Sequence, residues 1–316
     1  MEFVGALEVF LEMGLIFSVL AMGYYVSYSI LDFPDLTVEG TFLTGAVVFG
    51  LFVANGLNPW LGLVAAFLSG CLFGGVTGLL HVKLKIRPLL CGILVSTALI
   101  TVNLVGVTAG TVGDFRAESS SIISFGRDAM TLNDAFFGNL IPARVAALGN
   151  VPLRQPLIFL VVAVACKVLL DLYLNTKNGL LLRATGTNEQ FVKMLAVDPG
   201  KSKIIGLAIG NGCAAIAGAL YTHTVDGVNQ SMGLGMVIIG LASLIIGLSV
   251  FKKVRFLKST TKVIFGAIIY QACLVVVQRF GIPSAYNKFI MAVLFTLVLI
   301  LGGRQKKQGG VSRVNA

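Results

Sequence analysis

The sequence predicts an all-α protein, a polytopic bundle of membrane-spanning helices. Of its 316 residues, 56% are hydrophobic and only 12% are charged, and the mean hydropathy is +0.91. A water-soluble protein carries about 25% charged residues, so this chain has too little charge to cover a water-facing surface. The apolar residues also form runs close to the roughly 20 residues that a helix needs to cross a bilayer. Lipid is the solvent that fits both observations.

Nine apolar runs are candidate spans, and together they predict a single transmembrane domain over residues 1–316. They lie at 9–29, 37–54, 60–80, 89–107, 156–176, 204–222, 234–250, 261–280 and 288–302. The residues before the first span contain no Lys or Arg, whereas a signal peptide begins with positive charge, so we expect a retained first helix. A long polar loop, 108–155, separates the fourth span from the fifth.

The distribution of Lys and Arg predicts the orientation. Basic residues are concentrated in the loops 81–88, 177–203 and 251–262 and in the tail after residue 302. An even number of predicted spans separates each of these segments from the next, and short basic loops stay in the cytoplasm. We therefore expect a cytoplasmic C-terminus and an N-terminus outside. The net charge of +10 is then an excess on the inner face and indicates no nucleic-acid partner.

Two polar, glycine-containing segments interrupt the apolar pattern. The segment LDFPDLTVEG, on the predicted inner side, contains Asp35, Glu39 and Gly40 and leads into the short second span. The segment TVDGVNQSMGLG, residues 224–235, leads into the short seventh span in the same way. Paired broken helices in two halves of a chain indicate an internal pseudo-repeat with a pathway at its interface. The alternative is that both segments are ordinary loops.

Polar side chains inside the spans are candidates for lining that pathway. Ser96, Thr97 and Asn103 lie on the fourth span and Asn211 lies on the sixth. Polar groups avoid lipid and face the bundle interior. The alternative role is interhelical hydrogen bonding, which is worth about 0.6 kcal/mol on average.

Two further patterns concern how the spans are held together. Lys167 and Asp171 are four residues apart on the fifth span, a spacing at which they form an ion pair on one helix face. The pairs Gly70/Gly74 and Gly206/Gly210 predict close helix packing, either inside the subunit or between subunits.

The loop 177–203 is too polar to span a membrane, yet it is patterned. Thr187 and Gln190 have the spacing of a capping box and predict the start of a short helix. Phe191, Met194 and Leu195 fall on one face of that helix. We expect Pro199 to begin the next span. The apolar face needs a partner, either the lipid headgroup layer or a groove on a cytoplasmic protein.

No pattern in the chain predicts enzymatic activity, a cofactor or a metal site. Gly200-Lys201-Ser202 resembles the end of a phosphate-binding loop, but Leu195 stands where that motif has its first glycine. The two histidines have no companions at ligand spacing, and the five cysteines are scattered singly in apolar runs. We therefore expect no catalytic residues in this chain.

The stretch GLLLRATGTNEQFVKMLAVDPGKSKIIGLAIGNGCAAIAGAL resembles the coupling-loop region of importer permeases for branched-chain amino acids and ribose. In that family, G-x-x-x-R-A-x-G-x-N precedes a short coupling helix, a small residue and a Lys at the start of the next span. The matching residues here are Gly179, Arg183, Ala184, Gly186, Asn188, Ala196 and Lys203. FPDLTVEGTFLTGA is similar to the family's broken second helix. The resemblance covers most of the chain and favours the subgroup linked to amino acids, including aromatic ones. The chain departs from the ribose-type members in lacking a cytoplasmic first helix.

The resemblance implies the transmembrane subunit of an ATP-binding-cassette importer in a bacterial cytoplasmic membrane. Two copies of this chain would form the pathway for a small polar solute, with an amino acid as the first choice. An extracellular binding protein would deliver the solute. Two copies of a separate ATPase subunit would hydrolyse ATP and dock on the coupling loop, 177–203. The coupling residues would be Arg183, Gly186, Asn188, Phe191, Met194 and Leu195.

Three other readings remain open at this point. A secondary transporter driven by an ion gradient needs ionisable groups inside its spans. This chain has few beyond Lys167, Asp171 and the Glu8/Glu12 pair near the outer end of the first span. An importer of the same class for a sugar or nucleoside would show the same coupling loop. A membrane scaffold without transport would not need one. An ATPase gene and a secreted binding-protein gene beside this one would identify the class.

Overall fold

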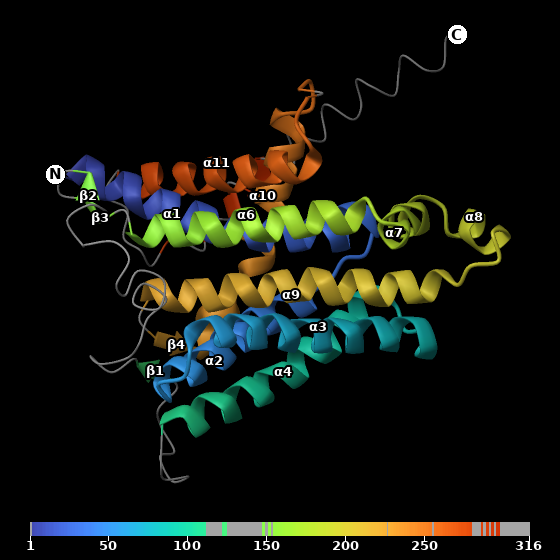
Figure 1. Ribbon diagram of the computed structural model, residues 1–316, viewed down its shortest axis with the longest axis horizontal. Coiled ribbons are helices and arrows are strands. Elements are labelled where there is room, and N and C mark those ends of the chain that lie inside the picture. Colours follow the sequence, from blue (N-terminus) through green and yellow to red (C-terminus); the bar gives the residue numbers. More distant parts are fainter. Residues whose placement is uncertain are drawn as a thin grey trace.

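The computed structural model is a bundle of long helices (Figure 1). It describes residues 2–111, 122–124, 147–148, 151–152, 154–225, 227–254, 256–279, 286, 289–290, 292–293 and 295–297. The first half contains α1 (Glu2–Tyr24), the π-helical segment η1 (Tyr25–Ile30), α2 (Thr37–Ala54), α3 (Pro59–Leu84) and α4 (Pro88–Thr111). The second half contains α6 (Arg154–Leu174), α7 (Lys177–Thr187), α8 (Glu189–Met194), α9 (Pro199–Val225), the 3-10 turn η2 (Gln230–Gly233), α10 (Met236–Val250) and α11 (Ser259–Arg279).

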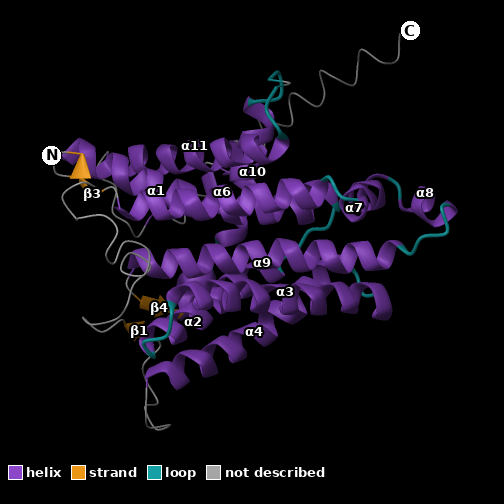
Figure 2. Cartoon of the chain, in the orientation of Figure 1, coloured by secondary structure: helices purple, strands orange, loops and turns teal. Residues whose placement is uncertain are grey.

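Short strands accompany the helices. β1 (Ile122–Ser124) pairs with β4 (Gly227–Asn229) in antiparallel fashion, and β2 (Ala147–Leu148) pairs with β3 (Val151–Pro152). Figure 2 shows β1 and β4 at one end of the bundle and α8 at the opposite end. These short pairs leave the all-α character of the bundle unchanged.

The helices confirm a polytopic membrane bundle. Within the described residues, eight helical segments are long and apolar enough to cross a membrane, and they match the first eight predicted spans. The sixth begins at Pro199, as predicted from the suitability of proline for the first turn of a helix, and thus five residues before the apolar run 204–222. Of the predicted ninth span, 288–302, the structure describes 289–290, 292–293 and 295–297, and the other residues lie outside the described part of the chain. The orientation predicted from Lys and Arg stays a prediction.

Burial divides the bundle into a centre and a lipid-facing layer. Spans α1, α2 and α9 are mostly buried, whereas α3, α4 and α6 are buried over only a third of their length. The exposed faces of that second group consist of large apolar side chains, Leu68 and Leu169 among them. Because lipid tails are as apolar as leucine, such faces are compatible with a bilayer.

Close packing of α3 against α9 fixes the centre of the bundle. A Cβ at Gly70 would lie 2.6 Å from Ala215 Cβ, and one at Gly74 would lie 2.7 Å from Asn211 Cβ. Gly210 approaches the backbone of α1 at Gly23. The small-residue pairs predicted from the sequence thus pack helices inside one subunit, which lets backbones approach where a larger side chain would separate them.

Candidate functional site

The polar segment 31–36, which interrupts the helices before α2 and is called the first break below, lies inside the bundle. From the sequence we expected it on the cytoplasmic side of the membrane. Asp35 is 2% exposed. Its Oδ1 accepts a hydrogen bond from Thr37 N at 2.9 Å, and its Oδ2 accepts one from Asn211 Nδ2 at 2.6 Å. Asn211 is the thirteenth of the 27 residues of α9. Non-helical backbone therefore occurs at membrane depth, where it is enclosed by protein.

Asn211 is the centre of a buried hydrogen-bond network. Its Oδ1 accepts from Thr41 Oγ1 at 2.8 Å, and its Nδ2 also donates to Leu207 O at 3.0 Å. The hydroxyls of Thr37 and Thr77 lie 2.9 Å apart and extend the network to α3. Asn211 thus joins α9 to the break.

Asp35→Leu should destabilise the protein. The substitution leaves the Asn211 amide and the Thr37 N–H without their acceptor, at a cost of about 1–3 kcal/mol for each buried donor. Thermal unfolding of the purified chain in detergent measures this loss. Asp35→Asn keeps an oxygen that can accept from one of the two donors and should lose clearly less. Equal stability of wild type and Asp35→Leu would show that the network contributes nothing.

The second break, the segment between α9 and α10 that contains β4 and η2, lies next to the first. After α9, the chain passes through β4 and η2, and α10 is preceded by Gly235, whose φ of 91° suits glycine. Gly235 N donates to Glu39 Oε1 at 3.0 Å, and Gln230 Nε2 donates to Ile100 O at 3.1 Å. The two interruptions, 196 residues apart in sequence at Glu39 and Gly235, are in direct contact.

A cavity of about 460 Å³ lies where the two breaks and α4 meet. It is lined by Glu39, Gly40, Leu43, Ser96, Ile100, Asn103, Asn229, Gln230, Ser231, Gly233 and Leu234. Asn103 Nδ2 donates to Gly40 O at 3.1 Å. The side-chain oxygens of Asn103 and Gln230 are buried and accept no hydrogen bond from any residue that the structure describes. These two oxygens are buried acceptors beside the cavity, whose lining also includes the Glu39 side chain.

The predicted pathway residues fall into two groups. Ser96 and Asn103 line this cavity together with Glu39 and Gly40. Asn211 instead bonds Asp35 within the network, and Thr97 is exposed and donates to Ile93 O at 2.7 Å. Neither of these two lines the cavity.

The loop 177–203 forms two helices at one end of the bundle (Figure 2). Asn188 caps α8, because its Oδ1 accepts from Phe191 N at 3.0 Å. The predicted capping box of Thr187 and Gln190 is therefore wrong. Thr187 is the last residue of α7, and its hydroxyl donates to Arg183 O at 2.8 Å. The extended backbone of Asn188 (φ −154°, ψ 94°) provides the geometry that an N-cap requires.

Helix α8 has one buried and one exposed apolar face. Val192 is fully buried, whereas Phe191, Met194 and Leu195 are 52%, 81% and 55% exposed. This is the face predicted from the sequence. Arg183 on α7 and Asn188, the N-cap of α8, are also exposed. An exposed apolar patch of this kind indicates an interaction surface.

Ion pairs hold α8 to the start of α9. Glu189 accepts from Lys203 Nζ at 2.7 Å and forms an ion pair with Lys193 at 3.0 Å. The bond from Lys203, followed by that from Lys193, holds the pKa of the Glu189 carboxyl below its usual value. A lowered pKa in the folded state gives stability that is present above the unfolded pKa and lost as the pH falls through the folded pKa. The bridge is therefore intact at neutral pH.

Helix α7 packs directly on the first break. Gly186 lies against the carbonyl group of Ile30 and the Cα of Leu31, where a Cβ would overlap the carbonyl oxygen. Gly206 of α9 lies against Leu182 and Leu31. The sequence marked Gly186 as part of a family motif, but its close approach to Ile30 is a tertiary contact that no local pattern contains.

The predicted ion pair on α6 is present and has further partners. Lys167 Nζ and Asp171 Oδ2 are 3.2 Å apart. Asp171 also accepts from Thr260 Oγ1 at 2.7 Å and from Lys258 Nζ at 3.4 Å. Asp171 thus ties α6 to the start of α11.

The fold and the exposed loop define a multi-pass membrane protein with a surface for a partner. The chain matches the family model described as branched-chain amino acid transport system / permease component over residues 6–299. It is 36% identical to a tyrosine transport system permease protein of Clostridioides difficile, over 91% of this chain and 88% of the relative. This chain therefore belongs to the permease family of ATP-binding-cassette importers.

Other relatives differ in the substrates that their names state. The autoinducer 2 import system permease protein LsrC of Enterobacter is 24% identical over 86% of this chain and 72% of the relative. The nucleoside transporter permease protein NupC of Lactococcus lactis is 23% identical over 67% of this chain and 66% of the relative. Members of this family are transport subunits that are not themselves catalytic. Because the named substrates of the relatives differ, family membership alone does not identify a substrate.

Proposed function

We propose that this chain is the transmembrane subunit of an importer for an amino acid, aromatic amino acids included. The observation that carries this proposal is the 36% identity to a tyrosine permease over about nine tenths of both chains. The two relatives with other named substrates are less similar, at 24% and 23% identity.

The cavity chemistry supports an amino acid. Glu39 lines the cavity with a carboxylate, and Asn103 and Gln230 line it with amide side chains. An α-ammonium group brings a positive charge and three donors to such acceptors. Leu43, Ile100 and Leu234 give the cavity an apolar side for the substrate's side chain. Ser96, Asn103 and the broken-helix residues Glu39 and Gly40 would line the route, while Asp35 and Asn211 would hold its shape.

The loop 177–203 would couple ATP hydrolysis to this route. A separate cytoplasmic ATPase subunit would receive the apolar face of α8, with Arg183 and Asn188 at the rim of the contact. Force on α8 would pass through α7 to Gly186, which lies on Ile30 and Leu31 at the start of the first break. Asp35 would carry the displacement to α9 through Asn211.

One chain has one such loop in its sequence, so two ATPase copies require two copies of this chain. We propose a homodimer with two ATPase subunits, in which the loop 177–203 and the C-terminus face the cytoplasm of a bacterial cell. An extracellular binding protein would deliver the substrate to the opposite face. Uptake of labelled tyrosine in cells expressing the complete transporter tests the substrate class. Competition by phenylalanine and leucine, but not by ribose or uridine, is the expected pattern.

Glu39→Gln should lower uptake about fivefold, since a bond to a charged group is worth roughly 1 kcal/mol more than a neutral one. The glutamine oxygen can still accept from Gly235 N, so the fold should persist. Asp32→Asn is the matched control, because Asp32 is exposed in the same break at φ 53°, where Asn is tolerated. Labelled-tyrosine uptake measures both variants. Unchanged uptake by Glu39→Gln would exclude the ammonium contact.

A further inference from the structure

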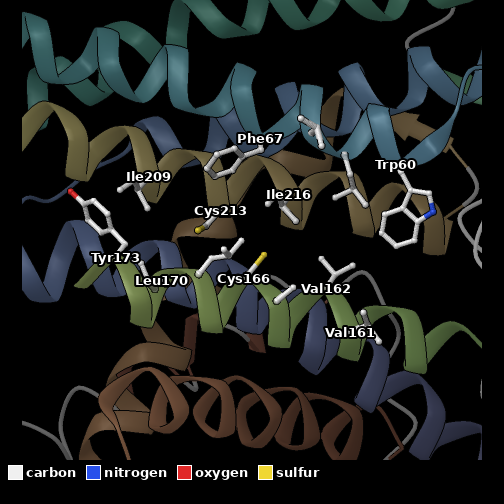
Figure 3. A pocket seen from close by; sticks show the side chains of 14 residues that line it. Trp60, Phe67, Val161, Val162, Cys166, Leu170, Tyr173, Ile209, Cys213 and Ile216 are labelled. Atoms are coloured by element: carbon white, nitrogen blue, oxygen red, sulfur yellow. The ribbon is translucent and has the colours of Figure 1, made fainter. Parts of the chain in front are cut away.

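A second cavity, of about 430 Å³, lies between α3, α6 and α9 (Figure 3). Trp60 lies at one end and Tyr173 at the other, with Phe67, Cys166 and Cys213 between them. The wall is almost wholly apolar, and the cavity lies beside the lipid-facing layer of the bundle. An apolar cavity of this size is suited to hydrocarbon rather than to water.

The apolar cavity is elongated and is called the groove below. A polar cavity of about 590 Å³ adjoins it at the end where the loop 177–203 lies. Tyr173 lines both cavities, and Ile205 and Ile209 continue the wall from one to the other, one turn apart on α9. The polar cavity also contains Asp198 and Lys201. Asp198 Oδ1 accepts from Gly200 N at 2.9 Å, and neither charged group forms an ion pair with a described residue. Opposite charges thus lie at the mouth of an apolar groove.

The dimensions of the groove fit one lipid chain. From Val161 to Tyr173 the groove follows 13 residues of α6, a rise of about 18 Å at 1.5 Å per residue. This is slightly more than one leaflet of a hydrocarbon core about 30 Å thick. A helix of a second copy is about 10 Å across and would not enter 430 Å³ spread over that length.

We propose that this groove binds a zwitterionic phospholipid with a phosphoethanolamine headgroup. One acyl chain would lie along Cys166 and Cys213 toward Trp60. The phosphate would accept from Lys201, and the ammonium would donate to Asp198. The headgroup would contact the ends of α6, α7 and α9 together, because Tyr173, Asn178 and Ser202 line the same cavity. Lipid binding would therefore hold the loop 177–203 on the bundle.

Trp60 makes the proposal directly measurable, because it is the only tryptophan in the chain. The full-length chain in detergent is titrated with phosphatidylethanolamine that carries bromine atoms near the methyl end of one acyl chain. Bromine quenches tryptophan fluorescence on contact, so saturable quenching is expected. Phosphatidylcholine and phosphatidylglycerol with the same brominated chain should bind about tenfold more weakly, since neither can donate a charged ammonium hydrogen bond to Asp198.

Variants separate the headgroup site from the groove. Asp198→Asn keeps the acceptor for Gly200 N and should abolish the preference for phosphatidylethanolamine over phosphatidylcholine. Lys201→Gln should weaken all three lipids. Ala165→Phe should reduce saturable quenching, because Ala165 lines the groove, whereas Val164→Phe on the exposed face of α6 should not. Thermal unfolding in detergent checks that each variant is folded.

Three outcomes would overturn the proposal. Equal quenching by all three lipids would exclude the headgroup assignment. Quenching that Ala165→Phe leaves unchanged would exclude the groove. A change of oligomeric state in Ala165→Phe would show that the groove receives a second copy of the chain.

Discussion

Phe191→Asp should abolish transport while the protein still folds and inserts. Phe191 is half exposed on α8, so the substitution disturbs little of the bundle. In contact with an ATPase groove, a buried phenylalanine contributes roughly 1.5–3 kcal/mol. An aspartate there loses that contribution and also places an unpaired charge in an apolar groove, which costs more still. A combined loss of about 3 kcal/mol weakens ATPase binding more than a hundredfold.

The matched control for this variant is Phe256→Asp. Phe256 is 97% exposed in a different basic loop, so the chemical change is the same but lies away from α8. We expect normal uptake and normal co-purification of the ATPase for this control. Val192→Asp should instead destabilise α8 itself, since Val192 is fully buried. Normal uptake by Phe191→Asp would show that α8 is only a membrane-surface element, and an ion-driven carrier would become the better account.

Gly186→Leu should uncouple ATP hydrolysis from uptake. A side chain at this position overlaps the Ile30 carbonyl and must push α7 away from the first break. Overpacking of this kind costs about 1–3 kcal/mol. The apolar face of α8 stays intact, so the ATPase should still co-purify with the variant. ATP hydrolysis should then proceed without a response to substrate-loaded binding protein, and labelled uptake should fall to background.

Gly75→Leu is the control for the glycine substitution. Gly75 lies in the transmembrane helix α3, and apart from its chain neighbours and the local backbone of α3, no heavy atom lies within 4 Å of a Cβ built there. We expect uptake close to that of the wild type. Unimpaired, ATP-dependent uptake by Gly186→Leu would contradict the route from α8 through α7 to the break. Loss of the folded chain from the membrane in this variant would instead indicate a purely structural role, which thermal unfolding detects.

The sequence was sufficient to predict the eight spans found among the described residues, because the length of an apolar run is a local property. It marked α2 at 37–54 with the bounds that the structure has, since Pro34 and Asp35 interrupt an otherwise continuous apolar pattern. It also predicted the exposed face of α8 from the helical spacing of Phe191, Met194 and Leu195. These features depend on residues within a few turns of one another.

The candidate functional site could not be predicted from the sequence in the same way, because it is built from contacts between residues that are far apart in the chain. Glu39 meets Gly235, and Asp35 meets Asn211, across 196 and 176 positions of sequence. Asn211 was a pathway candidate because it is polar inside a span, but tertiary structure gives it Asp35 and Thr41 as partners. The cap of α8 was misassigned to Thr187 because a capping box and a capping Asn188 one residue later predict nearly the same helix start.

A photo-crosslinking amino acid placed at Phe191 in intact cells tests the central claim most directly. The claim is that the apolar face of α8 lies in a groove of an ATP-binding subunit. It predicts that mass spectrometry identifies an ATP-binding-cassette ATPase cross-linked at this position, and that the same probe at Phe256 gives no such product. Cross-links from Phe191 to lipid alone, in cells that are taking up the substrate, would contradict the claim.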